Sequence, residues 1–201
     1  MTRRNAKNLI RQALLDLLTE LPLEEIDVQD IAAKAGLSRQ TFYYNFKNKR
    51  DLIDWILTCN ADLALAAYRS SHDINNYLCV AFTEAKKDQP LYSNLNAMQN
   101  GGYAQLLRDG VLSCAQIHLN IMDRQVIEMD LNDSLLVFKC AAGGLIQHWV
   151  ENGMRQTPQQ LADILCANMP QLVAKFFQYD HEQHLAEMEQ DPLEESFLSR
   201  R

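Results

Sequence analysis

Apolar side chains recur at intervals of three and four residues along most of the chain, which is the spacing of amphipathic helices. Near the start they form one helical face, made of Leu9, Ala13, Leu14, Leu17 and Leu18. This helix should end close to Pro22, because proline cannot continue a helix and restricts the residue before it. Seven glycines and five prolines leave few places for turns. The pattern therefore predicts an all-α protein.

Three further helices are expected at 28–35, 38–45 and 48–68. Each has a polar residue suited to cap its N-terminus: Asp27, Ser38 and Asn48, the last with Asp51 in a carboxylate version of the capping box. Gly36 is placed to supply the left-handed residue that ends a helix. The spacing thus predicts two short helices joined by a tight turn, followed by a long helix.

The remaining apolar periodicity predicts helices at 73–88, 90–99, 103–121, 133–152 and 158–178, the last kinked at Pro170. We expect an N-terminal helical domain at 1–50, a second helical domain at 51–179, and an acidic tail at 180–201.

Charge divides the chain in a way that the total of −7 conceals. Residues 1–50 contain nine Lys and Arg against six Asp and Glu, a balance of 9 − 6 = +3, whereas residues 51–201 contain ten against twenty, a balance of 10 − 20 = −10. A basic first segment on an acidic body indicates an anionic partner for that segment alone, although solvated charge can give the same split.

The five cysteines are odd in number, scattered and without a Cys-x-x-Cys pair, which favours reduced thiols over a disulfide framework or a zinc site. No apolar run approaches the roughly 18 residues that a bilayer-spanning helix needs, and the charged start does not fit a signal peptide. We therefore expect a cytoplasmic protein with no membrane association.

The segment 26–51 has the spacing of a helix-turn-helix. Two short helices that cross at about 90 to 120° need a small residue at their closest approach, a glycine at the turn and an apolar residue after it. Ala32, Gly36 and Leu37 occur in that order. Phe42 and Phe46 can then anchor the next helix inward, which leaves an outer face rich in hydrogen-bond donors and free of acids.

These residues resemble the TetR/AcrR family of bacterial transcriptional regulators. The matching pattern is Ile31-Ala32-x-x-Ala35-Gly36-Leu37-Ser38-x-x-Thr41-Phe42-Tyr43-x-x-Phe46-x-x-Lys49-x-x-Leu52. A second passage, Gly144-Leu145-Ile146-x-x-Trp149-Val150-x-x-Gly153-Met154 with Pro158, resembles the branch that includes dihydroxyacetone kinase regulators. The resemblance implies an N-terminal DNA-binding domain, a C-terminal helical bundle and a homodimer on a pseudo-palindromic operator.

The chemistry of the outer face agrees with DNA binding. In a helix-turn-helix the second helix enters the major groove, where Arg39 can pair with guanine and Gln40 with adenine. The other expected DNA contacts, mostly to sugar and phosphate, are Ser38, Thr41, Tyr43, Tyr44, Asn45, Lys49, Arg3 and Arg4. Lys49 lies at a helix start, where free amides already favour a phosphate.

The body could enclose a ligand, because helical bundles often do. Candidate contacts are Met98, Tyr103, Cys114, His118, Phe138 and Trp149, each of which could equally be ordinary core. Cys114 and His118 lie one turn apart, but two ligands do not make a metal site, so we expect no metal and no cofactor. The chain has no phosphate loop, nucleophile elbow or Glu-x-x-His pair, so we expect no enzyme.

Two helices have apolar or small residues on a second face, which predicts a dimer interface. The residues are Val137, Ala141, Gly144, Leu161, Leu165, Leu172 and Phe176. The sequence therefore predicts a homodimeric regulator, by default a repressor, that a small-molecule effector controls. The alternative is a coactivator that a kinase-like protein partner controls instead of a free ligand.

Overall fold

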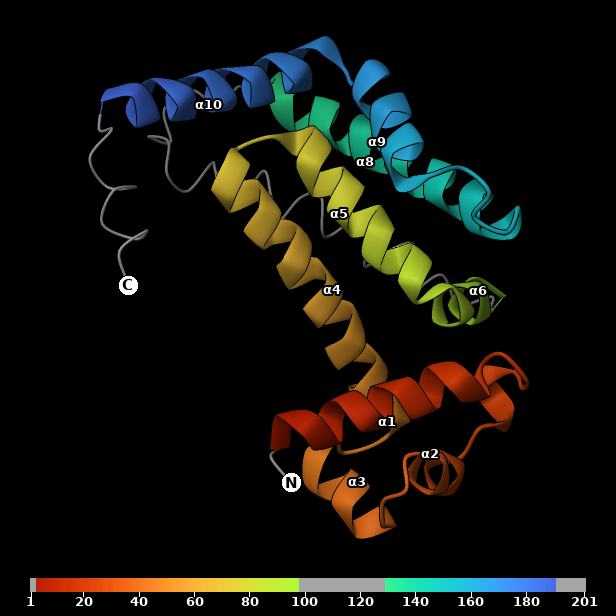
Figure 1. Ribbon diagram of the computed structural model, residues 1–201. Helices are drawn as coiled ribbons and strands as arrows, with labels where there is room; N and C mark the ends of the chain where they lie inside the picture. The colour runs from red at the N-terminus through yellow and green to blue at the C-terminus, as the bar shows by residue number, and fades with distance from the viewer. Residues whose placement is uncertain (1–2, 98–128, 191–201) are drawn as a thin grey trace.

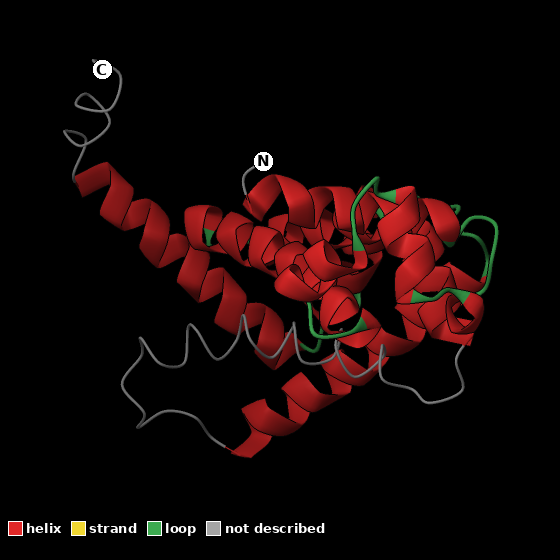
Figure 2. Cartoon of the chain, turned by 90° about the horizontal axis from the view of Figure 1, so that it is seen from below, coloured by secondary structure: helices red, strands yellow, loops and turns green. Residues whose placement is uncertain are grey.

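The computed structural model describes residues 3–97 and 129–190, and all of this part is helical apart from turns and loops (Figures 1 and 2). The helices are α1 (Arg3–Leu17), the 3-10 turn η1 (Leu23–Glu25), α2 (Val28–Lys34), α3 (Arg39–Asn45), α4 (Lys49–Ser71), α5 (Ile74–Lys87), α6 (Gln89–Ala97), α8 (Met129–Glu151), α9 (Pro158–Ala167) and α10 (Gln171–Gln190). The predicted all-α fold is confirmed. The helix expected at 103–121 lies outside the described residues.

The first three helices form a small head at one end of the molecule (Figure 1). α1 packs on α2 and α3, and the apolar side chains between them are fully buried. Ile10 and Leu14 come from α1, Ile31 from α2 and Phe42 from α3, each with no exposed surface. The apolar faces that the periodicity predicted therefore pack together in the head, and their core continues into the rest of the molecule.

The local signals of the turn are confirmed. Gly36 has a φ of 66°, in the left-handed region that the end of α2 requires. Asp27 donates its backbone N–H to a carboxylate oxygen of Asp30 at 2.8 Å, which closes the capping box at the start of α2. At the start of α4, the side-chain oxygen of Asn48 accepts from the N–H of Asp51 at 2.9 Å.

α4 runs from the head into the body, where α5 packs along it (Figure 1). Its first turns bury Leu52 and Ile56 and its later turns bury Ala64 and Tyr68, all within one continuous hydrophobic core. α5 also packs on α9, α6 packs on α8, and α8 packs on α10. α4 therefore belongs to both the head and the body, which is made of the helices that follow it.

The structure divides the predicted 158–178 helix into α9 and α10 rather than kinking it. Pro170 has no N–H to donate, and the turn at Asn168 and Met169 separates the two helices. α10 then continues to Gln190, beyond the expected domain boundary at 180. α1 begins at Arg3, earlier than its apolar face suggested, and η1 was not predicted. Within the described residues no helix is long and apolar enough to cross a bilayer.

Candidate nucleic-acid interface

α3 lies at the end of the head, away from the body, as expected for a recognition helix (Figure 1). The side-chain oxygen of Ser38 accepts from the N–H of Thr41 at 3.1 Å, and the two hydroxyl oxygens are 2.9 Å apart. Phe42 is fully buried on the opposite face and fixes the rotation of the helix. A capped and anchored helix presents its remaining side chains in a defined register.

Four of the predicted DNA contacts are exposed on this helix. Arg39 and Gln40 occupy its first turn and are open to solvent. Tyr43 and Tyr44 are 50% and 72% exposed, values that are high for aromatic side chains. Tyr43 stands edge-to-face on Phe42, with ring centroids 5.7 Å apart, so the buried ring supports the exposed one.

Asn45 corrects the prediction. Its side chain is only 8% exposed, and its amide nitrogen donates to the backbone carbonyl of Thr41 at 2.8 Å. The last residue of α3 therefore turns back onto its own helix instead of facing outward. An Asn side chain in a helix can bond to the carbonyl four residues earlier, which here belongs to Thr41. This spacing was the sequence signal that could have revealed its orientation.

Lys49 also has partners inside the protein. Its ammonium nitrogen donates to the carbonyl oxygens of Leu23 at 2.5 Å and Ile26 at 2.6 Å. Leu23 begins the η1 turn and Ile26 follows it, and the sequence did not reveal this turn. Two of the three ammonium donors are thus used to join α4 to the α1–α2 connection.

Two exposed lysines were not among the predicted contacts. Lys34 ends α2, and Lys47 lies in the loop after α3, with its side chain in solvent. Arg50 is exposed too, but it is paired with Asp54 at 2.8 Å. Arg3 and Arg4 form the first residues of α1, and their side chains lie outside the described structure. The basic character of the segment was visible in the sequence, whereas the orientation of each lysine was not.

Only two of the predicted ligand contacts, Phe138 and Trp149, fall in the described part. They are 1% and 0% exposed and belong to the core, where Trp149 stands edge-to-face on Phe82. Met98, Tyr103, Cys114 and His118 lie outside the described residues. Among the described residues, no three His, Cys, Asp or Glu side chains gather as a metal site would require.

The predicted interface residues separate into two groups. Val137, Ala141 and Gly144 are exposed on α8, and Leu172 is 40% exposed on α10. Phe176 is half-buried. Leu161 and Leu165, by contrast, are 0% and 4% exposed, because α9 turns them into the protomer's own core beside α5. The structure corrects the prediction for these two residues.

The sequence of the head matches a known family model. Residues 10–56 match the model of the bacterial regulatory proteins of the tetR family. This segment of the chain is a tetR-type regulatory domain. The match covers α2, α3 and most of α1, with the first turns of α4, so the segment predicted to bind DNA is the one that resembles these bacterial regulators.

Solved structures share the fold of this chain at low sequence identity. The dihydroxyacetone kinase operon activator DhaS aligns with a TM-score of 0.64 and 17% identity, over 82% of this chain and 96% of DhaS. The fatty acid degradation regulator FadR from Bacillus halodurans aligns with a TM-score of 0.52 and 17% identity, over 80% of this chain and 92% of FadR. No curated protein sequence matches the chain significantly.

Proposed function

We propose that the chain is a cytoplasmic homodimer that binds a pseudo-palindromic operator through α3 and represses transcription. The observation that carries this proposal is the outer face of α3, where Arg39, Gln40, Tyr43 and Tyr44 are exposed on a helix anchored by Phe42. Arg39 and Gln40 read base edges, and the two tyrosines bind sugar and phosphate. Lys34 and Lys47 add phosphate contacts at the edge of the same head.

The homodimer is supported by an apolar surface on α8. Leu136 and Val137 are 53% and 61% exposed, and Cys140, Ala141 and Gly144 continue this open face along the helix. α10 packs beside α8 and exposes further apolar side chains, among them Leu172, Tyr179 and Leu185. A second copy of the chain covers both helices in a four-helix contact, because a two-fold axis presents the same apolar surface from each side.

Gly144 gives a direct test of this interface. A Cβ built at this position meets no atom within 4 Å, so a side chain fits the protomer without a clash. Gly144→Glu should therefore preserve the helical content and convert the dimer into monomers in sedimentation experiments, with loss of tight operator binding. Ala66→Glu, at an exposed site on α4, adds the same charge away from the interface and should remain dimeric.

A Gly144→Glu protein that sediments as a dimer and binds operator normally would show that α8 is not part of the interface. If the wild-type protein is a monomer at micromolar concentration and binds no DNA at low salt, the proposed function is wrong.

We propose that a small-molecule effector bound in the body controls operator occupancy by changing the separation of the two heads, which α4 connects to the body. A ligand shifts this equilibrium only through different affinities for the two arrangements. Effector and operator should then weaken each other by the same factor in binding titrations.

The alternative is control by a protein partner. We retain it because the chain is similar in fold to DhaS. In that case operator affinity responds to a second protein purified with the chain and to no small molecule from the cell extract.

A further inference from the structure

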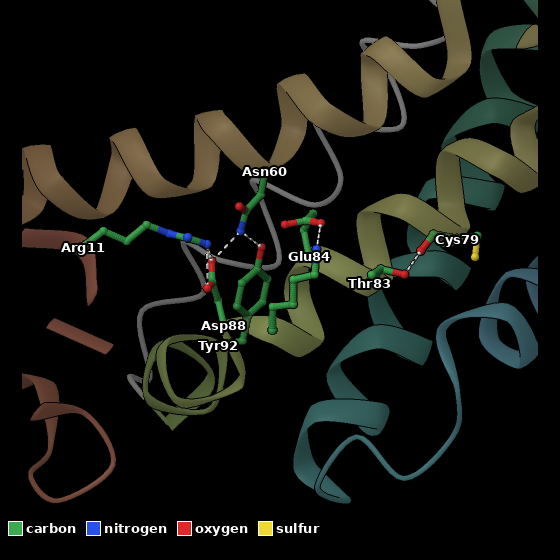
Figure 3. A network of polar contacts seen from close by, with 8 residues as sticks. Arg11, Asn60, Cys79, Thr83, Glu84, Asp88 and Tyr92 are labelled. Carbon is green, nitrogen blue, oxygen red and sulfur yellow. Dashed lines mark hydrogen bonds and ion pairs between the residues drawn. The ribbon is translucent and has the colours of Figure 1, made fainter. Parts of the chain in front are cut away.

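An ion pair between a partly exposed arginine and a buried carboxylate connects the head to the body where α5 meets α6 (Figure 3). Nη2 of Arg11, on α1, donates to both carboxylate oxygens of Asp88 at 2.7 Å. Asp88 is 1% exposed, and its Oδ2 also accepts from the side-chain amide of Asn60 on α4 at 2.8 Å. Three segments that are far apart in the sequence therefore meet at one carboxylate.

Asp88 is also held rigidly by its own backbone. Its N–H donates to the carbonyl of Glu84 at 3.1 Å and ends α5, while its carbonyl accepts from the N–H groups of Leu91 and Tyr92 in the first turn of α6. The carboxylate thus projects from a fixed corner of the body toward α1. Movement of this corner moves Arg11, because a buried carboxylate cannot exchange its partner for water without a large desolvation cost.

α6 provides a second attachment to the head. The side-chain oxygen of Asn94 accepts from the backbone N–H of Leu23 at 2.9 Å, at the start of η1. Its amide nitrogen donates to the carbonyl of Pro90 at 2.9 Å, in the preceding turn of α6. Asn94 therefore holds the α1–η1 connection, whereas Asp88 holds the middle of α1.

We propose that Asp88 and Asn94 are positioning residues for DNA binding: they hold the head at one angle to the body and so determine the half-site spacing that the dimer accepts. α4 alone is a single connection, about which a head can tilt. With attachments to α1 and to η1, the head is fixed at two further points. This inference rests on the proposed homodimer, because spacing is a property of two heads.

Spacing is sensitive to head orientation because B-DNA is helical. One added base pair moves a half-site by about 3.4 Å and rotates it by about 35°. A fixed head cannot follow this rotation, whereas a loosely held head can. Loss of the attachments should therefore broaden the range of accepted spacings and leave the sequence read by each half-site unchanged.

The first experiment measures head position within one protomer. Nitroxides at Gln29 on α2 and Ile164 on α9, both exposed sites, are introduced through unnatural amino acids, and labelled protein is diluted with unlabelled protein. Asp88→Asn preserves the shape of the side chain and removes its charge. Asp54→Asn is the matched control, because it breaks the exposed Arg50–Asp54 pair on α4.

We expect a narrow distance distribution for the wild-type and Asp54→Asn proteins and a clearly broader one for Asp88→Asn. If Asp88→Asn does not fold, as judged by circular dichroism, Asn94→Ala removes the second attachment and tests the same claim. A variant that folds and retains the wild-type distribution would overturn the proposal.

The second experiment measures affinity for operators whose half-sites are separated by the selected spacing or by one base pair more or fewer. The wild-type protein should discriminate among them, and Asp88→Asn should reduce this discrimination by about threefold to thirtyfold, the size of energetic coupling between linked sites. Unchanged discrimination in Asp88→Asn contradicts the inference, since a residue needed only for stability does not alter spacing. Absence of any spacing preference in the wild-type protein instead contradicts the proposed dimer, and the distance measurement still tests how the head is held.

Discussion

Replacement of Lys49 by methionine tests whether this residue binds a phosphate, as the sequence predicts, or stabilises the fold, as its bonds in the structure indicate. Methionine preserves most of the apolar stem and removes the ammonium group, which donates to the carbonyls of Leu23 and Ile26. Hydrogen bonds from a charged group contribute more than neutral ones, but Lys49 is partly exposed, so about 1 kcal/mol for each bond is a reasonable value. The variant should therefore lose about 2 kcal/mol of unfolding free energy.

This loss is measurable by thermal denaturation. For a chain of this size, about 2 kcal/mol lowers Tm by about 4 to 8 °C. Lys47→Met is the matched control, because Lys47 is exposed two residues earlier, and its Tm should stay close to that of the wild-type protein.

The salt dependence of operator binding provides a second measurement on the variants Lys49→Met and Lys47→Met. Each phosphate contact contributes about −0.9 to the slope of log K against log salt. Lys47→Met should lose one such contribution, whereas Lys49→Met should keep the wild-type slope. A Lys49→Met protein with an unchanged Tm and a slope flattened by one contact would refute the structural role and restore Lys49 as a phosphate ligand.

Three further predictions concern base recognition and the cysteines. Arg39→Ala should relax the preference at one or two positions of each half-site by about 1 to 3 kcal/mol, and unchanged base preference in a DNA selection would contradict this assignment. Iodoacetamide should modify Cys59 and Cys166 slowly, because burial raises the pKa of both thiols. Cys140, exposed on α8, should react faster in Gly144→Glu than in the wild-type dimer, and equal rates in peptide mass mapping would contradict a covered α8 face.

The helices of the head could be predicted well because local signals agree with one another. Gly36 ends one helix, Ser38 caps the next and Phe42 anchors it. Each role depends on residues nearby in the sequence, and the helical spacing of the three is consistent. The same is true of the exposed pair Arg39 and Gln40, whose position follows from the anchoring of the opposite face.

The parts that sequence could not reveal depend on contacts between distant segments. Lys49 bonds to carbonyls about 25 positions away, and Asp88 bonds to Arg11 across 77 positions. Neither pairing has a periodic signature, because each depends on how two helices pack. Leu161 and Leu165 are a further example. The sequence showed that they share an apolar face, but not that α9 ends before α10 and packs this face inside the protomer.

Selection of double-stranded DNA from a random library by the purified protein tests the central claim most directly. If α3 reads operator DNA from two heads related by a two-fold axis, the enriched sequences should contain two inverted copies of one half-site at a fixed spacing. Binding to them should fall steeply as salt rises. Recovery of an unbiased library at low salt, or of a single unpaired motif, would contradict the account.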